Sequence, residues 1–430
     1  MTEVLSVPVD VERRSAPGAP GYLELLAGEA TVRAVFQPLI DLRDSAVRGY
    51  EALARGPAGS RLATPGALFT AARRLGRLAE LDWACRAAAF RGALDGGLQR
   101  SLGLFVNAEP EALGVPCPAH LLPVWVEAAR RLHLVVELTE RDLVADPARL
   151  VHVVQELREL GCSIALDDVG AHPDSLTLMP LVEPDVIKLD TALIQRAPAD
   201  DTARVLHAVA AQAERTGAMV VAEGIETEEH LETALAYGAT VGQGWLLAIP
   251  QDRLGVTRGT GPAVPARAAA LEGLGTPFEE VTTRVGVRHG PVSVVRVMTR
   301  QLLETAGQLS SPPVVLCALP LGTEGQQADA DLRMLVDLTG TSALLGVAGH
   351  RLPHHLPAAV LRGPLAKEDR LAAEWDVVVV GAHFAAAVVA RPTRGGWAFA
   401  LTHDRDTVVS VARGLLARHG ARSPLPPALW

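Results

Sequence analysis

Short hydrophobic runs that end in polar residues recur along the first part of the chain. Two of them, 163–166 and 186–189, consist mostly of Ile, Val, Leu and Ala and are typical of strands buried on both faces. The first run ends in two adjacent carboxylates, Asp167 and Asp168, and the second contains Lys188. Carboxylates side by side at the end of a buried strand repel each other, so a divalent cation is one explanation. A simple helix cap at Asp168 is the other.

The same arrangement recurs in other hydrophobic runs. The polar residues at the predicted strand ends are Asn107, Glu137, Asp167, Asp168, Lys188 and Glu223. From strand to strand they lie 21 to 35 residues apart, which leaves room for a strand and a returning helix. Repeated βα units of this length predict a (β/α) barrel, in which such side chains converge at the C-terminal end of the strands.

The regular pattern stops near residue 250 and resumes after a segment rich in Gly, Pro, Ala and Arg. We therefore predict a flexible N-terminus (1–20), a barrel domain (21–252), a linker (253–274), a smaller C-terminal α/β or α+β domain (275–420) and a tail (421–430). This division gives each domain enough residues for a hydrophobic core of its own.

Outside the βα repeats the pattern predicts further elements. Runs 32–39 and 46–53 predict strands that can pair as a hairpin, and 66–94 predicts a helix, whole or in two pieces. The C-terminal domain is predicted to contain helices over 292–308, 329–339 and 404–418, and strands over 314–319, 343–348, 377–380, 384–390 and 397–402.

The charge and composition narrow the function. The net charge is −9, which argues against nonspecific binding to nucleic acid, because such binding depends on Lys and Arg neutralising phosphates. An anionic substrate would need metal ions or a local basic patch. Glu51, Asn107, Glu137, Asp167, Asp168 and Glu223 offer the hard oxygen donors that Mg²⁺ and Mn²⁺ prefer. Any one of them alone could equally be a cap or a surface acid.

The four cysteines and the apolar segments bear on location. The cysteines are scattered, without CxxC spacing, which favours free thiols in a reducing compartment. The N-terminal segment lacks the basic start and apolar core of a signal peptide, and no stretch has the roughly 18 uninterrupted apolar residues of a membrane span. We expect a soluble, cytoplasmic protein.

Eight short motifs occur in a fixed order along the chain. They are FQPLI with Gln37, EALAR from Glu51 to Arg55, FVNAEP with Asn107, ELTE from Glu137 to Glu140, DDVG from Asp167, IKLD with Lys188, AEGIE with Glu223 and Glu226, and QG with Gln243. Together they resemble the EAL-domain phosphodiesterases over residues 30–250. The resemblance implies a TIM-like (β/α)8 barrel whose first strand is antiparallel, hydrolysis of cyclic di-GMP to linear 5′-pGpG with two Mg²⁺ or Mn²⁺ ions, and dimerisation through the barrel.

The resemblance also implies a role for each matching residue. The implied metal ligands are Glu51, Asn107, Glu137 and Asp167 for one ion, with Asp167 shared and Asp168 serving the second. Glu223 would act as general base or second-metal contact, Lys188 would lie near the attacking water, and Glu140 would anchor the loop after the Asp pair. The implied substrate contacts are Arg55 on a phosphate and Gln37, Glu226 and Gln243 in the substrate pocket.

The loop after the Asp pair departs from the family pattern. Residues 169–175 read VGAHPDS, which lacks the usual Gly-aromatic-Ser segment and contains Pro173. The change alters the backbone freedom of the loop, which in the family couples dimerisation to the second metal. A catalytically inactive receptor for cyclic di-GMP, which would signal through protein contacts, is therefore the alternative to an enzyme.

The C-terminal domain offers fewer motifs. Segments 363–391 and 397–418 resemble the DICT sensory domain, which implies an input module with an unknown ligand that regulates the barrel. Three neighbouring histidines could suggest a metal site, but the prolines among them disfavour the helix that would bring them together: His350, His354 and His355. Trp375 and Trp397 are expected to pack in the core or to line a pocket.

Overall fold

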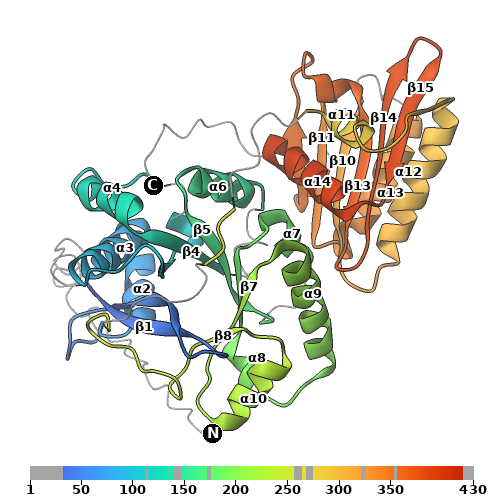
Figure 1. Ribbon diagram of the computed structural model, residues 1–430. Helices are drawn as coiled ribbons and strands as arrows, with labels where there is room; N and C mark the ends of the chain where they lie inside the picture. Colours follow the sequence, from blue (N-terminus) through green and yellow to red (C-terminus); the bar gives the residue numbers. More distant parts are fainter. Residues whose placement is uncertain are drawn as a thin grey trace, which may run out of the picture.

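The computed structural model describes residues 32–112, 115–139, 147–171, 176–255, 264–267, 275–320, 326–352 and 356–419. These residues form two sheets, a closed eight-stranded barrel and a separate seven-stranded sheet with helices on both faces (Figure 1). Within this part of the chain no helix combines the length and apolarity needed to cross a bilayer.

The barrel strands follow one another in sequence order. They are β1 (Arg33–Asp41), β2 (Val47–Arg55), β3 (Gly103–Asn107), β4 (His133–Thr139), β5 (Ser163–Val169), β6 (Val186–Leu189), β7 (Met219–Ala222) and β8 (Val241–Gly242). Strand β1 is antiparallel to both of its neighbours, β2 and β8, whereas the other neighbouring pairs are parallel. The predicted TIM-like barrel with an antiparallel first strand is therefore confirmed.

Helices cover the outside of the barrel. They are α2 (Pro65–Arg74), α3 (Leu78–Asp95), α4 (Leu122–Arg131), α6 (Pro147–Glu159), α7 (Met179–Val182), α8 (Thr191–Gln195), α9 (Asp200–Thr216) and α10 (Glu228–Ala236), with a 3₁₀ turn η1 (Pro110–Ala112). The local sequence explains where α2 starts. The Thr64 side chain caps the helix by accepting a hydrogen bond from the Ala67 amide, and Pro65 occupies the first helical position. The helix predicted over 66–94 is divided in two at Leu75–Arg77.

The second sheet has the strand order β12-β11-β10-β13-β14-β15-β9. Its strands are β9 (Arg288–Gly290), β10 (Val314–Leu319), β11 (Leu344–Gly349), β12 (Val360–Pro364), β13 (Trp375–Val380), β14 (Ala385–Thr393) and β15 (Gly396–Thr402). The associated helices are α11 (Pro277–Thr282), α12 (Val292–Gly307), α13 (Gln326–Asp337), α14 (Arg405–His419) and the 3₁₀ turns η3 (Leu338–Gly340) and η4 (Arg370–Ala373). Strands β9 and β12 and helix α11 were not predicted, because each is short and lacks a clear hydrophobic period.

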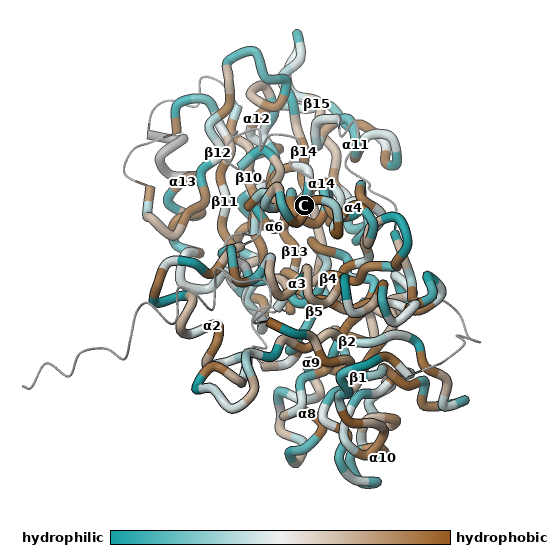
Figure 2. Tube along the Cα trace, turned by 90° about the vertical axis from the view of Figure 1, so that its left-hand side faces the viewer, coloured by the Kyte–Doolittle hydropathy of each residue, from teal (hydrophilic) through white to brown (hydrophobic). Residues whose placement is uncertain are grey.

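Helix α14 lies between the two sheets. Its buried positions include Val408, Val409, Val411 and Ala412, which point in different directions around the helix axis. It packs on strands β10 to β14 on one side and on α6 and α7 of the barrel on the other (Figure 1; Figure 2). The hydrophobic core consequently continues from the barrel into the C-terminal domain.

Candidate active site

A ring of hydrophobic side chains fills the barrel and sets the position of the polar ones. The ring contains Leu39, Phe105, Val135, Ala165, Val186, Val221 and Val241. Side chains two residues apart on a strand point to the same side. The residues two positions further toward the open end of the barrel are Gln37, Asn107, Glu137, Asp167, Lys188, Glu223 and Gln243. Gln37 belongs to this layer because β1 runs opposite to the other strands.

Lys188 is the centre of this polar layer. Its Nζ atom lies 2.6 Å from Oε1 of Glu137 and 2.6 Å from Oε1 of Glu223. It also lies 3.0 Å from Oδ1 of Asp167 and 3.5 Å from Oε2 of Glu51. The lysine is fully buried, so its charge is compensated by these side chains rather than by water. The structure therefore brings together predicted residues from five different strands or strand ends.

Two amide side chains of the layer, Asn107 and Gln243, donate hydrogen bonds to its carboxylates. Nδ2 of Asn107 donates to Oε1 of Glu51 at 3.2 Å and to Oε2 of Glu137 at 2.9 Å. Nε2 of Gln243 donates to Oε2 of Glu51 at 2.7 Å and to Oε1 of Gln37 at 3.1 Å. These bonds fix the orientation of the Glu51 and Glu137 carboxylates.

A second group of acids lies at the rim of the layer. One carboxylate oxygen each from Asp167, Asp168 and Glu223 lies within 4.8 Å of the other two. Asp168 is exposed and has a left-handed backbone conformation with φ of 56°. Asp tolerates this conformation better than most residues, and here it turns the Asp168 side chain out of the strand alternation. Two consecutive residues of one strand thereby reach the same site.

Burial dominates the electrostatics of the centre. It raises the pKa of Glu137 well above its ordinary value, and the nearby Glu51 adds to this shift. Burial likewise raises the pKa of Glu223 to about 8. Burial alone would lower the pKa of Lys188, but the surrounding carboxylates, with Asp167 first among them, hold it well above its usual range. Four carboxyl groups thus face one ammonium, and a bound cation would favour the ionised form of the acids whose pKa is raised.

The donor set fits hard divalent metals. Oε1 of Glu137 and Oδ1 of Asp167 are buried and lie 2.6 and 3.0 Å from Nζ of Lys188, and within the described residues neither has a further hydrogen-bond donor. A carboxylate oxygen has two lone pairs, so the contact with Lys188 leaves one on each oxygen for a cation. Carboxylate and amide oxygens without Cys or His are the ligands typical of Mg²⁺ and Mn²⁺.

Two predicted site residues, Arg55 and Glu226, make hydrogen bonds outside this centre. Nη1 of Arg55 donates to the carbonyl oxygen of Ala54 at 2.8 Å, and burial followed by the charge of Arg33 lowers its pKa. Glu226 is exposed, and its backbone amide donates to Nδ1 of His230. Glu140 and residues 172–175 of the altered loop lie outside the described residues.

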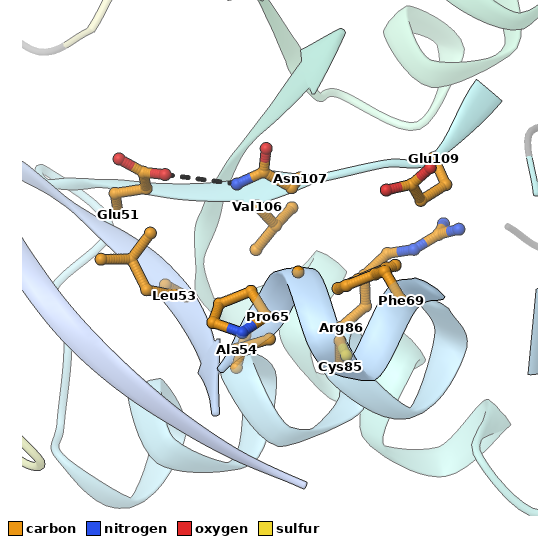
Figure 3. Close-up of a pocket in the computed structure, with 13 residues that line it drawn as sticks. Glu51, Leu53, Ala54, Pro65, Phe69, Cys85, Arg86, Val106, Asn107 and Glu109 are labelled. Carbon is orange, nitrogen blue, oxygen red and sulfur yellow. Dashed lines mark hydrogen bonds between the residues drawn. The ribbon is translucent and has the colours of Figure 1, made fainter. Parts of the chain in front are cut away.

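A cavity of about 370 Å³ opens beside Glu51 and Asn107. Figure 3 shows Pro65 and Phe69 along one wall and Arg86 and Glu109 at its far end. These lining residues were not predicted from the sequence. The available signal was the spacing of Asp82 and Arg86, four residues apart on α3, where they form a buried ion pair.

The other residues that the sequence singled out, where the structure describes them, make ordinary packing or backbone contacts. Nδ1 of His350 makes a 3.2 Å contact with the carbonyl oxygen of Leu365, and His354 and His355 lie outside the described residues. The rings of Trp375 and Trp397 pack edge to face with centroids 6.1 Å apart. All four cysteines are free, as predicted.

Comparison with known proteins places these features in a family. The chain is 28% identical over 237 residues to the uncharacterized EAL-domain containing protein YkuI of Bacillus subtilis, which covers 54% of this chain and 58% of that protein. It is 30% identical over 159 residues to the cyclic di-GMP phosphodiesterase RocR of Pseudomonas aeruginosa, which covers 36% and 40% respectively. The chain thus spans about half the length of these curated relatives.

Part of the chain is also similar to solved structures. A manganese and cyclic di-GMP complex of Klebsiella pneumoniae BlrP1 is 27% identical, with a TM-score of 0.47, and the match covers 53% of this chain and 59% of that chain. The family model of the EAL domain matches residues 24–250, which is more than half of the chain. The chain belongs to the EAL domain family.

Proposed function

We propose that the barrel hydrolyses cyclic di-GMP to linear 5′-pGpG with two divalent cations, Mg²⁺ or Mn²⁺. The observation that carries the proposal is the meeting of Glu51, Glu137, Asp167 and Glu223 around Lys188. A relative such as RocR supports the choice of substrate.

The proposed metal ligands are those that the family resemblance implies. Glu51, Asn107, Glu137 and Asp167 would hold one ion, and Asp167 with Asp168 would hold the second, with Glu223 at its edge. Two such ions stabilise the attacking and leaving oxygens of an in-line displacement at phosphorus. The residues of the chain supply the remaining parts of the reaction.

Lys188 and Glu223 are proposed to handle charge and protons. The ammonium of Lys188 offers a fixed positive charge to the phosphorane-like transition state, and its rigid contacts hold it in place. Glu223 lies beside it at the end of β7, where its carboxylate can accept a proton from the attacking water. Both roles require a substrate phosphate at the open side, next to Asp168.

Substrate binding is proposed for residues on the rim and the adjacent cavity. Gln37 and Gln243 form one wall of the polar layer, and Arg55 would grip a phosphate after turning from Ala54. Glu226, which is exposed in the segment between β7 and α10, would contact a base. Glu140 would anchor loop 169–175, as in the family.

The C-terminal domain is proposed to regulate the barrel. We assign residues 21–252 to the barrel and 275–420 to a DICT-like sensory domain whose ligand is unknown. Support comes from the packing of α14 on both units. We also propose that the protein acts in the cytoplasm and forms a homodimer through the barrel.

A catalytically inactive cyclic di-GMP receptor is the second candidate. The altered segment Ala171-His172-Pro173 after the Asp pair favours it, because this loop supports the second metal in the family. A metal titration separates the two functions. Chelator-treated full-length protein should produce pGpG only after Mn²⁺ or Mg²⁺ is added, and Glu51→Ala should remove this response. The exposed-pair variant Glu127→Ala is the control. Binding of cyclic di-GMP without any product in either metal would select the receptor.

A further inference from the structure

A cluster of arginines lies at the junction of the barrel and the C-terminal domain. Four guanidinium groups meet there from four separate segments: Arg158 on α6, Arg215 on α9, Arg267 in the segment 264–267, and Arg413 on α14. They surround Glu183 and Asp185, which lie between α7 and β6. The cluster is therefore built from both domains and lies at the end of β6 opposite to the polar layer that contains Lys188.

The contacts of Glu183 join the two domains. Nη1 of Arg413 lies 2.6 Å from Oε2 of Glu183, and Nη1 of Arg215 lies 3.7 Å from its Oε1. Glu183 itself has a left-handed backbone conformation, with φ of 45°. Nη2 of Arg158 donates to the carbonyl oxygen of Glu183 at 2.6 Å, and this hydrogen bond helps to hold the backbone in the turn.

The contacts of Asp185 complete the inner part. Its Oδ2 accepts the backbone amide of Ile164 at 2.9 Å and lies 3.8 Å from Nη2 of Arg158. Its Oδ1 lies 3.5 Å from Nε of Arg267. The Asp185 carboxylate therefore uses much of its hydrogen-bonding capacity to link the start of β6 to the start of β5.

Positive charge exceeds negative charge at the junction. Among the described residues, the inner carboxylates are Glu183 and Asp185, and a third, Asp406, lies on the outer side against Arg215 with 60% of its side chain exposed. Four guanidinium groups thus share two inner carboxylates. Burial lowers the pKa of Arg158 to about 10, so this group still carries its charge at neutral pH.

Several arginine donors lack acceptors. Arg158 is 4% exposed and Arg413 is 5% exposed. Within the described ranges, Nε of Arg158 and both Nε and Nη2 of Arg413 are buried and have no hydrogen-bond acceptor. A buried charge with unused donors is costly, and an anion that accepts several hydrogen bonds would remove that cost. Arg215 and Arg267 are 18% and 26% exposed at their side chains, so the cluster extends to the protein surface.

We infer that the cluster of Arg158, Arg215, Arg267 and Arg413 is a binding site for a compact oxyanion of the phosphate class. Phosphate presents several acceptor oxygens to guanidinium groups, which bind them in fork geometry. A free phosphate and the phosphate group of a small metabolite share this chemistry. The site is separate from the proposed active site and does not depend on the proposed hydrolysis.

Inorganic phosphate provides the test. The melting temperature of the full-length protein is measured in increasing sodium phosphate against sodium chloride of equal ionic strength, with a chelator present to keep divalent ions from the acidic layer. We expect a saturable rise in phosphate alone. Arg413→Gln should weaken phosphate binding, so that the half-saturating concentration rises about tenfold or more, as expected for the loss of a charged hydrogen bond. Glu183→Gln should strengthen phosphate binding, because Nη1 of Arg413 loses its carboxylate partner and can then bind the phosphate.

Two further variants keep the test decisive. Arg267→Gln changes a more exposed group and serves if Arg413→Gln does not fold, and it should also weaken the phosphate response. Arg131→Gln, which alters an exposed pair on α4, is the matched control and should leave the response unchanged. Equal shifts in phosphate and chloride, or shifts that are the same in Arg413→Gln, Arg267→Gln and wild type, would overturn the inference. A half-saturating concentration that is lower for a phosphate monoester than for inorganic phosphate would identify a metabolite as the source.

Discussion

Nζ of Lys188 lies 2.6 Å from Oε1 of Glu137, and both side chains are almost completely buried. A lysine in this position neutralises part of a carboxylate cluster that would otherwise be unstable without cations. The two residues come from β6 and β4, which are not neighbours in the barrel, so the contact crosses its interior. The ion pair links the folding of the barrel to the charge of the proposed metal site.

Replacing Lys188 by methionine tests this link. Lys188→Met keeps the length of the side chain but leaves four carboxylates without their cation, and we expect a loss of about 3–5 kcal/mol in the free energy of unfolding. Added Mn²⁺ should restore more stability in this variant than in wild type. Chemical denaturation with and without Mn²⁺ measures both effects, with Lys367→Met at an exposed site as the control. A Mn²⁺ effect no larger than that in wild type would contradict the arrangement.

Substitutions at Asp168 separate backbone from charge. Asp168→Asn keeps a residue that tolerates φ of 56° but removes the carboxylate, so turnover should fall at least about tenfold while the melting temperature stays close to wild type. Asp168→Val should lose turnover and, in addition, about 1–2 kcal/mol of stability, because a β-branched residue is strained in this conformation. Equal melting temperatures for the two variants would show that the backbone conformation is not constrained.

The pH dependence of stability should reflect a buried acid in the second sheet. Burial, together with the neighbouring Glu374, raises the pKa of Asp376 well above its ordinary value. The folded state then binds a proton more tightly than the unfolded state, so this contribution to stability is present below the unfolded pKa near 4 and is lost as pH rises through the folded pKa. Asp376→Asn should therefore stabilise the protein at pH 8 by roughly 1–3 kcal/mol and by much less at pH 5. Thermal melts of wild type and Asp376→Asn at the two pH values test this prediction. A stabilisation that is the same at both pH values would exclude titration of Asp376 as its cause.

The C-terminal helix should be needed by the barrel. Because α14 covers α6 and α7, removing residues 275–430 exposes apolar surface on the barrel. We expect the shortened chain to melt at a lower temperature and to bind the dye ANS, which the full chain should not. An unchanged melting temperature without dye binding would mean that the barrel is stable alone.

Much of the barrel and its polar layer was predictable from the sequence. Asn107, Glu137 and Asp167 each end a hydrophobic strand, and alternation along the strands is enough to bring them to one end of a barrel. The contact between Gln37 and Gln243 was not accessible in this way, because it depends on the antiparallel course of β1 and on closure against β8.

Other features depend on tertiary packing that leaves little trace in local sequence. Helix α14 is buried on several sides, so its sequence lacks the one-sided hydrophobic pattern that would indicate its partner. The pairing of Arg413 with Glu183 likewise joins residues that are 230 positions apart. The cavity lined by Phe69 and Arg86 arises from the packing of α2 and α3 against the barrel rim. No sequence motif indicates this packing.

The central claim is that this chain opens cyclic di-GMP by metal-assisted attack of water. The most direct measurement is mass spectrometry of the product formed by the full-length protein with Mn²⁺ in water enriched in ¹⁸O. We predict 5′-pGpG that carries one ¹⁸O atom in its new phosphate group, and none of this product from Glu51→Ala. Intact cyclic di-GMP after prolonged incubation of folded, metal-loaded wild-type protein would contradict the claim.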